Sequence, residues 1–288
     1  MRNRILLLLC AALLLLSVCG CAAKPEEEVF LEIAGKSCSS FTETLNLESL
    51  ELTEADLSNI GKLHALKSLT ISAIVLENLD FMKSLKALET LSLSSCQVRD
   101  FSALAELGAL KTLELTHTVY PGAEATLCSV TQLEDLAFSS TGACDLSFLS
   151  SFTNLKKLSL FGPVSDLTPL SGLHALETLY ITQSQVSDLT PIGSLTNLRT
   201  LLIVQANIRD ASPLSGCTSL ETVSLQLNQI TDASPLASLP ALQSADLQSN
   251  PVDLSTIQGI ALVSVSDDAG QEVHYRYGTV VTPDSGSN

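Results

Sequence analysis

LHALETLYITQSQVSDLTPIGS, at residues 173–194, is followed directly by LTNLRTLLIVQANIRDASPLSG at 195–216 and CTSLETVSLQLNQITDASPLAS at 217–238. Each 22-residue unit is a row, whose positions are numbered from 1. The three rows align without a gap, and apolar residues recur at positions 1, 4, 7, 9 and 14. Self-similarity at a fixed period of this kind indicates a solenoid, in which each repeat contacts its neighbours.

Two patterns inside each row predict the path of the backbone. The apolar residues at positions 7 and 9, such as Leu179 and Ile181, have the period of a short strand with one buried face. Thr190-Pro191 predicts the start of a helical turn, with the hydroxyl residue as its N-cap and the proline next. Because one row cannot bury its own leucines, rows must stack. We therefore expect an α/β solenoid, with a parallel β-sheet on one side and short 3-10 or α-helical turns on the other.

The rows resemble the leucine-rich repeat family, in particular the class of bacterial internalin-like proteins. The shared pattern is Leu-x-x-Leu-x-x-Leu-x-Leu-x-x-Asn-x-Ile-x-Asp-x-Ser/Thr-Pro-Leu, which covers residues 44–260. The resemblance implies a horseshoe or arc with the sheet on its concave face, and an asparagine ladder at position 12 between turns. That asparagine is present at Asn228 and Asn250, so we expect the middle rows to be less regular. Elsewhere the position is occupied by Ile74, Cys96, Thr118, Thr141, Ser184 and Ala206.

The regular rows occupy residues 63–260 and need a cap at each open end. Residues 29–62 lack the period, and we interpret them as an N-terminal cap with a degenerate repeat. Residues 261–281 alternate apolar and polar side chains around turn-forming residues, which predicts a capping hairpin over the last strand edge. We expect residues 282–288 to be a disordered tail.

The N-terminus has the pattern of an export signal. Arg2 and Arg4 precede an apolar run at residues 5–16 that is too short to span a bilayer comfortably. Gly20-Cys21 resembles the cleavage site of bacterial lipoproteins. The resemblance implies that residues 1–20 are removed, that Cys21 carries lipid, and that residues 21–28 tether the domain to the extracytoplasmic face of the cell membrane. The alternative is ordinary signal cleavage, with Cys21 left as a spare thiol.

Composition and motifs argue for binding and against catalysis. The chain has 288 residues, no tryptophan and a formal net charge of -16, which argues against nucleic acid or an anionic membrane as the bound surface. It has no Gly-x-Ser-x-Gly, no His-Glu-x-x-His, no phosphate-binding glycine loop and no Cys-x-x-Cys, so we expect neither an enzyme nor a cofactor. His117 beside Glu114 is interpreted as a surface pair. An enzyme with an unfamiliar site remains an alternative.

Two sets of side chains that can bind metals are interpreted as structural. Six aspartates share one repeat position and are expected to hold backbone N–H groups of the turns, with a row of calcium ligands as the alternative. They are Asp100, Asp145, Asp166, Asp188, Asp210 and Asp232. Five cysteines beyond Cys21 match no metal or disulfide framework, and Cys96 and Cys217 are expected to be buried. The five are Cys38, Cys96, Cys128, Cys144 and Cys217.

The candidate binding site lies at positions 8, 10 and 11, which should point outward from the sheet. In the first rows these positions carry mostly serine and threonine. In four later rows they carry apolar residues, which suggests a protein-binding patch with a polar rim. The apolar members are Phe161, Tyr180, Leu202, Val204 and Leu227, and the surrounding amides are Gln183, Gln205 and Gln226. The alternative is that the solenoid tolerates these residues or that its own termini cover them.

From these patterns we expect a monomeric surface lipoprotein that docks a protein partner on its concave face. The family resemblance implies protein–protein interaction and, by analogy alone, adhesion or recognition of a host surface. A second hypothesis is a scaffold or regulator of another protein of the bacterium's own envelope. The sequence does not identify the partner.

Overall fold

One continuous sheet follows the repeat array from end to end. The computed structural model describes residues 27–48, 51–118, 122–139, 145–266 and 270–281. Within these residues the sheet has 13 strands in chain order, and every pairing from β3 to β15 is parallel. The parallel strands are β3 (Thr44–Leu47), β4 (Ser68–Ser72), β6 (Thr90–Ser94), β8 (Thr112–Thr116), β9 (Asp135–Ser139), β10 (Lys157–Phe161), β11 (Thr178–Thr182), β12 (Thr200–Val204), β13 (Thr222–Ser224), β14 (Ser244–Asp246) and β15 (Val263–Ser266).

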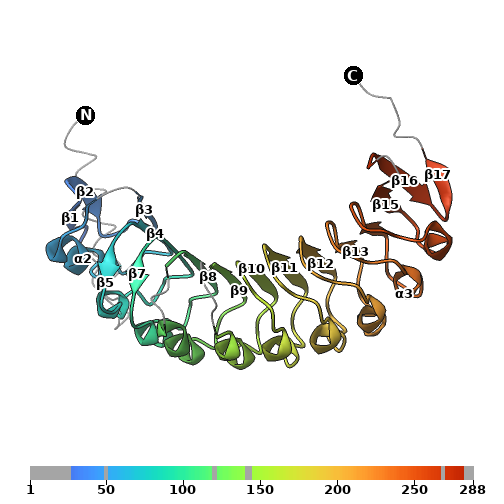
Figure 1. Cartoon of the computed structure of the whole chain (residues 1–288). Helices are drawn as coiled ribbons and strands as arrows, with labels where there is room; N and C mark the ends of the chain where they lie inside the picture. The colour runs from blue at the N-terminus through green and yellow to red at the C-terminus, as the bar shows by residue number, and fades with distance from the viewer. Residues whose placement is uncertain (1–26, 49–50, 119–121, 140–144, 267–269, 282–288) are drawn as a thin grey trace, which may run out of the picture.

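Short helical turns occupy the other side of the array. Figure 1 shows the strands along the inner side of an arc and the turns along its outer side. This arrangement confirms the predicted leucine-rich repeat arc. The turns are η1 (Asp80–Met82), η2 (Ser102–Glu106), η3 (Ala123–Ser129), η4 (Ser147–Ser151), η5 (Thr168–Leu170), η6 (Thr190–Ile192), η7 (Ser212–Gly216), α3 (Ser234–Ala237) and η8 (Leu254–Ile257). A second, two-stranded parallel sheet joins β5 (Val75–Leu76) to β7 (Gln97–Val98).

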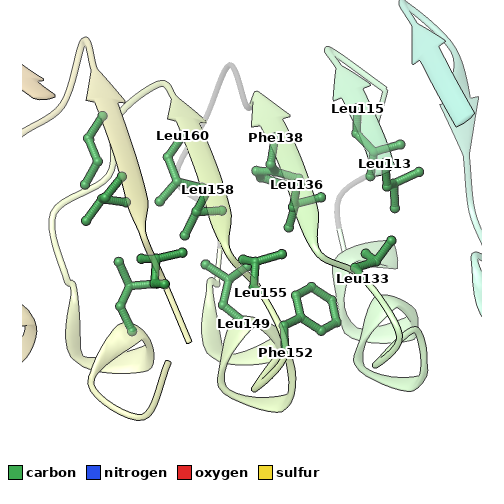
Figure 2. Packing of buried hydrophobic residues seen from close by; sticks show 14 of the residues in the cluster. Leu113, Leu115, Leu133, Leu136, Phe138, Leu149, Phe152, Leu155, Leu158 and Leu160 are labelled. Carbon is green, nitrogen blue, oxygen red and sulfur yellow. The ribbon is translucent and has the colours of Figure 1, made fainter. Parts of the chain in front are cut away.

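The core is a stack of aliphatic layers between the sheet and the turns. Positions 1, 4, 7 and 9 are buried in every row between residues 63 and 238. Leu158 pairs in register with Leu179, which pairs with Leu201, so equal positions lie side by side along the stack. Figure 2 shows this packing in the middle rows, where side chains from β8, β9 and β10 meet those of the turns. Since neighbouring rows cover each layer on both sides, no row forms a core alone.

Position 11 adopts a left-handed backbone conformation in each row where the structure describes that position. The φ angle is 57° at Gln183, 57° at Gln205 and 56° at Leu227, and Gly162 has a φ of 127°. The same conformation occurs at Ala73, Ser95, His117 and Ser249. Non-glycine residues enter this region at a cost of roughly 1–2 kcal/mol each. The stacked rows therefore impose the bend that ends each strand, whichever side chain is present.

Position 12 is bonded in different ways along the array. The Asn228 side-chain amide donates to the carbonyl oxygens of Ile203 at 2.9 Å and Leu225 at 3.0 Å, and its oxygen accepts from the Ile208 N–H at 3.1 Å. Asn250 repeats this pattern one row later. The expectation of less regular middle rows is wrong for strand pairing. Strands β4 to β12 of the main sheet each have five residues, whereas β13 and β14, which belong to the rows with asparagine, have three. The buried aliphatic columns, and not the asparagines, therefore align the strands.

The turns begin one residue earlier than the sequence suggested. The N-cap of η6 is Leu189, which makes no side-chain cap bond, and Thr190 is already the first residue of the turn. The Asp188 carboxylate instead accepts the Thr190 N–H at 2.8 Å. Equivalent bonds are made by Asp100, Asp145, Asp166, Asp210, Asp232 and Asp253. The predicted N-cap is therefore wrong, and the predicted structural role of the aspartates is confirmed.

Charged side chains of alternating sign occupy position 5, directly before the strand of each row, and form a ladder across the sheet. Its signs alternate without interruption through Glu43, Lys67, Glu89, Lys111, Glu134, Lys156, Glu177, Arg199 and Glu221. Ion pairs join Lys67 to Glu43 at 2.8 Å, Lys156 to Glu134 at 2.7 Å and Arg199 to Glu221 at 2.9 Å. The charge pattern therefore repeats every second row, and an alignment of single rows conceals it.

A hairpin and a helix lie at the N-terminal end. Strands β1 (Phe30–Ile33) and β2 (Lys36–Ser39) pair antiparallel, and helix α2 (Glu54–Ile60) begins with a capping box between Thr53 and Asp56. The Asp56 carboxylate also accepts the Ala34 N–H at 2.7 Å, which ties the helix to the hairpin. Hydrogen bonds, chiefly from the Thr53 hydroxyl, lower the pKa of Asp56.

The C-terminal end is a three-stranded antiparallel meander. β15 pairs with β16 (Glu272–Arg276), which pairs with β17 (Thr279–Val281). The alternating stretch 272–281 is thus two strands and not one. Tyr277 and Gly278 have φ angles of 48° and 76°, and two consecutive positive values form the two-residue turn typical of tight hairpins.

Candidate protein-binding face

The structure brings the central pair of the candidate patch together. Tyr180 on β11 lies opposite Leu202 on β12, in register and on the face away from the core. Val204 on β12 and Phe161 on β10 are both opposite Thr182, which separates them on β11. Leu227 follows β13. The patch is therefore a band across four rows, at positions 8, 10 and 11, with one threonine inside it.

Two serines that pair in register with the aromatic members of the band are buried. Ser159 points outward between Ala137 and Tyr180 in the register, and yet it is buried. Ser139, which lies opposite Phe161, is also buried, and its hydroxyl accepts the His117 N–H at 2.8 Å. Phe161 and Leu227 are exposed, whereas Tyr180, Leu202 and Val204 are half-buried. The side chains thus rest on the sheet and leave their outer surfaces accessible.

The three glutamines occupy two different settings. Gln183 and Gln205 are exposed at the left-handed position 11, in line with Leu227 of the next row. The Gln226 side chain is half-buried at position 10, where its amide contacts the Asp246 carboxylate. The exposed pair is available as a polar rim, and Gln226 is held within the protein.

Few charges reach the concave face beside the band. Lys157 and Asp135 neutralise each other across β10 and β9 at 3.1 Å. On the other side the next charged side chain within a strand is Asp246 on β14, whose carboxylate contacts the Gln226 amide. Between them β11, β12 and β13 carry only uncharged side chains. In a chain of net charge -16, this neutral band is a distinct surface.

The other candidate residues do not form a reactive site in the described part of the chain. Glu114 and His117 are both exposed, and no ion pair joins them there. Burial raises the pKa of the Cys96 thiol, and it raises that of Cys217 to about 11, so both behave as buried apolar groups, as predicted. Cys128 is exposed and Cys38 is half-buried, while Cys144 lies outside the described residues. No cluster of three metal-ligating side chains occurs among the residues described.

The predicted signal, Cys21 and most of the tether lie outside the described residues, as does the predicted tail at 282–288. Across the described ranges, no helix is both long and apolar enough to cross a membrane.

The sequence and the fold are similar to those of known leucine-rich repeat proteins. A family model described as leucine-rich repeats in two copies matches residues 196–238. The structure of internalin C2 from Listeria monocytogenes is 32% identical, with a TM-score of 0.56, and the match covers 69% of this chain and 85% of that one. Internalin InlF from the same organism is 24% identical, with a TM-score of 0.67 and coverage of 82% and 73%.

A more distant structure shares the fold. The ectodomain of the receptor kinase GASSHO1/SCHENGEN3 from Arabidopsis thaliana, in complex with CASPARIAN STRIP INTEGRITY FACTOR 2, is 19% identical with a TM-score of 0.52, covering 68% of this chain and 26% of that one. No curated protein matches the sequence. The repeat pattern, the parallel sheet and the identity to internalin C2 over most of its length show that this chain belongs to the internalin-like leucine-rich repeat proteins.

Proposed function

We propose that this protein is a lipid-anchored bacterial surface protein that binds a protein partner on the concave face of its repeats. The observation that carries the proposal is the neutral band around Tyr180 and Leu202. Aromatic and aliphatic side chains clustered on an otherwise polar surface are typical of interaction sites, and aromatic residues often contribute most of the binding energy. The Arabidopsis receptor ectodomain, which has the same fold, was solved in complex with CASPARIAN STRIP INTEGRITY FACTOR 2. This complex supports a binding role for the present domain.

The shape of the band defines the partner. Tyr180 and Leu202 sit on neighbouring strands of a preformed sheet, so little ordering is needed on binding. The surrounding side chains are hydroxyls and amides, and the two flanking carboxylates, Asp135 and Asp246, already have internal partners. The fitting partner is a protein surface that presents an apolar side chain within an uncharged polar rim. We infer that the protein acts by docking this surface and not by chemistry.

The source of the partner defines two forms of the proposal. Attachment of lipid at Cys21 would place the domain on the extracytoplasmic face of the cell membrane, where it meets both host surfaces and neighbouring envelope proteins. Adhesion to a host surface is the form suggested by the internalin resemblance. A scaffold or regulator in the bacterium's own envelope is the second form, and the origin of the captured protein separates the two.

The test is a paired capture experiment. Residues 24–288 are immobilised as the natural sequence, as Tyr180→Glu/Leu202→Glu, and as Thr70→Glu/Ser92→Glu. The second pair is a matched control because Thr70 and Ser92 occupy position 8 on the adjacent strands β4 and β6 and are also half-buried. Envelope and host-surface extracts are passed over all three proteins. We expect a protein retained by the natural and control forms but lost by Tyr180→Glu/Leu202→Glu.

The captured protein is then purified and its affinity measured directly. Loss of two central anchors should weaken the Kd by roughly 100-fold or more, whereas the control should change it little. Circular dichroism checks that all three forms are folded. Equal affinity for both double variants would contradict the concave band as the binding site.

A further inference from the structure

A second apolar surface lies at the N-terminal end of the arc. Val29, Phe30 and Phe41 have exposed fractions of 52%, 63% and 46%. Val29 directly precedes the β1–β2 hairpin, Phe30 is its first residue, and Phe41 is two residues beyond its end. Two of the other exposed large apolar side chains of the described part, Phe161 and Leu227, belong to the concave band. Clustered apolar side chains on a surface indicate something that covers them.

The local hydrogen bonds hold these side chains in one region. Phe30 pairs with Ser39 across the hairpin, and the Ser40 N–H donates to the Val29 carbonyl at 2.7 Å. The Phe41 N–H donates to the Ser39 hydroxyl at 3.2 Å. Ile33 of β1 is buried against the core, so Phe30, three residues earlier in a strand of period two, is on the opposite, outward face. Hydrogen bonds of the backbone therefore hold the three residues that carry this apolar surface.

The position of this surface in the chain indicates what it meets. Val29 is eight residues after Cys21 in the chain, a length that spans at most about 29 Å. With the lipid of Cys21 in the bilayer, this end of the arc stays within that distance of the membrane surface. Figure 1 shows the β1–β2 hairpin at one extremity of the arc, and β17 at the other. The exposed phenylalanines thus lie at the anchored end.

The charges nearby exclude an electrostatic attachment to anionic lipid. Glu27, Glu28 and Glu32 outnumber Lys36 and Lys62 at this end. The Glu28 carboxylate also accepts a hydrogen bond from the Ser39 hydroxyl at 2.6 Å, which brings negative charge beside the aromatic side chains. Basic clusters are what attract proteins to anionic headgroups. Contact here must come from apolar side chains entering the boundary between headgroups and acyl chains.

We propose that the N-terminal end of the arc rests on the bilayer, with Phe30 and Phe41 inserted at the boundary between headgroups and acyl chains. The inference depends on the lipid anchor proposed for Cys21. The inserted side chains add apolar contact with the membrane to the contact made by the anchor.

The chain contains no tryptophan, so a single tryptophan reports on its own surroundings. The full chain, lipidated through its own signal, is prepared as Phe30→Trp, Phe41→Trp and Tyr277→Trp. Tyr277 is the matched control because it is an aromatic residue with a 65% exposed fraction at the opposite end. Each protein is reconstituted into phosphatidylcholine vesicles with plain or brominated acyl chains, and into vesicles containing phosphatidylglycerol.

We expect the emission of Trp introduced at positions 30 and 41 to shift to shorter wavelength and to be quenched by brominated chains. The control should emit at long wavelength in both vesicles. The quenching should persist at high salt and should not increase with phosphatidylglycerol. Flotation of the protein with the vesicles reports the anchor separately. Flotation without quenching at position 30 or 41 overturns this inference alone, and failure to float overturns it together with the proposed anchor.

Discussion

The two asparagine-bearing rows at the C-terminal end and the rows before them share one core but differ at position 12. Asn228 joins four backbone groups in two rows through both its amide and its oxygen. Thr118 donates to the Leu93 carbonyl at 2.7 Å, and its backbone carbonyl accepts the Val98 N–H that an asparagine oxygen would accept. Ala206 has no polar side-chain atom, and the buried Ser184 hydroxyl has no partner among the described residues.

The difference separates what forms the solenoid from what strengthens it. Strand pairing continues unchanged through the rows of Ser184 and Ala206, since the leucine columns and the ladder of backbone hydrogen bonds align them. An asparagine supplies donors and an acceptor, and so satisfies buried backbone groups on both sides of the bend. Its absence therefore lowers local stability without changing the fold. The variants that follow test this interpretation.

Asn228→Ala should have the largest effect. The Ile203 carbonyl and the Ile208 N–H lose their partner in a buried setting, and each unsatisfied group costs about 1–3 kcal/mol. We expect the free energy of unfolding to fall by roughly 3 kcal/mol, as measured by urea denaturation. Hydrogen exchange should show the loss first in rows 195–238. If the free energy of unfolding fell by less than it does for an average surface substitution, the stabilising role assigned to Asn228 would be contradicted.

Ala206→Asn is the reverse experiment. In this row the new side chain would reach the Ile181 carbonyl and the Val186 N–H, which stand at the positions that Asn228 uses one row later. Each hydrogen bond made contributes about 1 kcal/mol net, against the cost of ordering the side chain, so we expect a gain of about 1 kcal/mol. Destabilisation would show that the middle rows have closed around the smaller residue.

Ser184→Ala should stabilise the protein slightly. Burial of a hydroxyl without a partner is unfavourable, and its removal leaves the packing of the row intact. We expect a gain of roughly 0.5 kcal/mol in the free energy of unfolding. The control is Thr118→Val, which removes a hydroxyl bonded to two carbonyls and should destabilise the protein. If the free energy of unfolding changed in the same direction in Ser184→Ala and Thr118→Val, the distinction between an unbonded and a bonded buried hydroxyl would be refuted.

The sequence predicted the features that recur in every row and missed those that depend on neighbouring rows. The leucine columns and the pairing of Tyr180 with Leu202 followed from the period alone. The left-handed position 11 gave no signal, because stacking imposes it on residues as different as Gln183 and Leu227. The charge ladder was missed because its pattern repeats every two rows, whereas the leucine pattern repeats every row. The partner could not be predicted, since exposed side chains report only the chemistry that it must match.

Turn aspartates occur in both regions, so acid should weaken both. Hydrogen bonds from the Thr190 hydroxyl and N–H lower the pKa of Asp188 below its ordinary value of 3.8, and Ser234 does the same for Asp232. A depressed native pKa adds stability that is complete above the unfolded value and is lost as the pH falls through the native one. The free energy of unfolding should therefore decline below about pH 4.

Asp188→Asn isolates this contribution and should have the smallest effect at neutral pH. An asparagine can hold the turn, since the Asn78 oxygen already accepts the Asp80 N–H at 3.1 Å. We expect the urea midpoint at pH 7 to change little and its decline between pH 4 and pH 2 to become shallower, because one titrating group is removed. Adding Asp166→Asn, whose pKa is lowered in the same way, should deepen the effect. An unchanged acid slope would assign the loss to other carboxylates, such as Asp56 of the N-terminal cap.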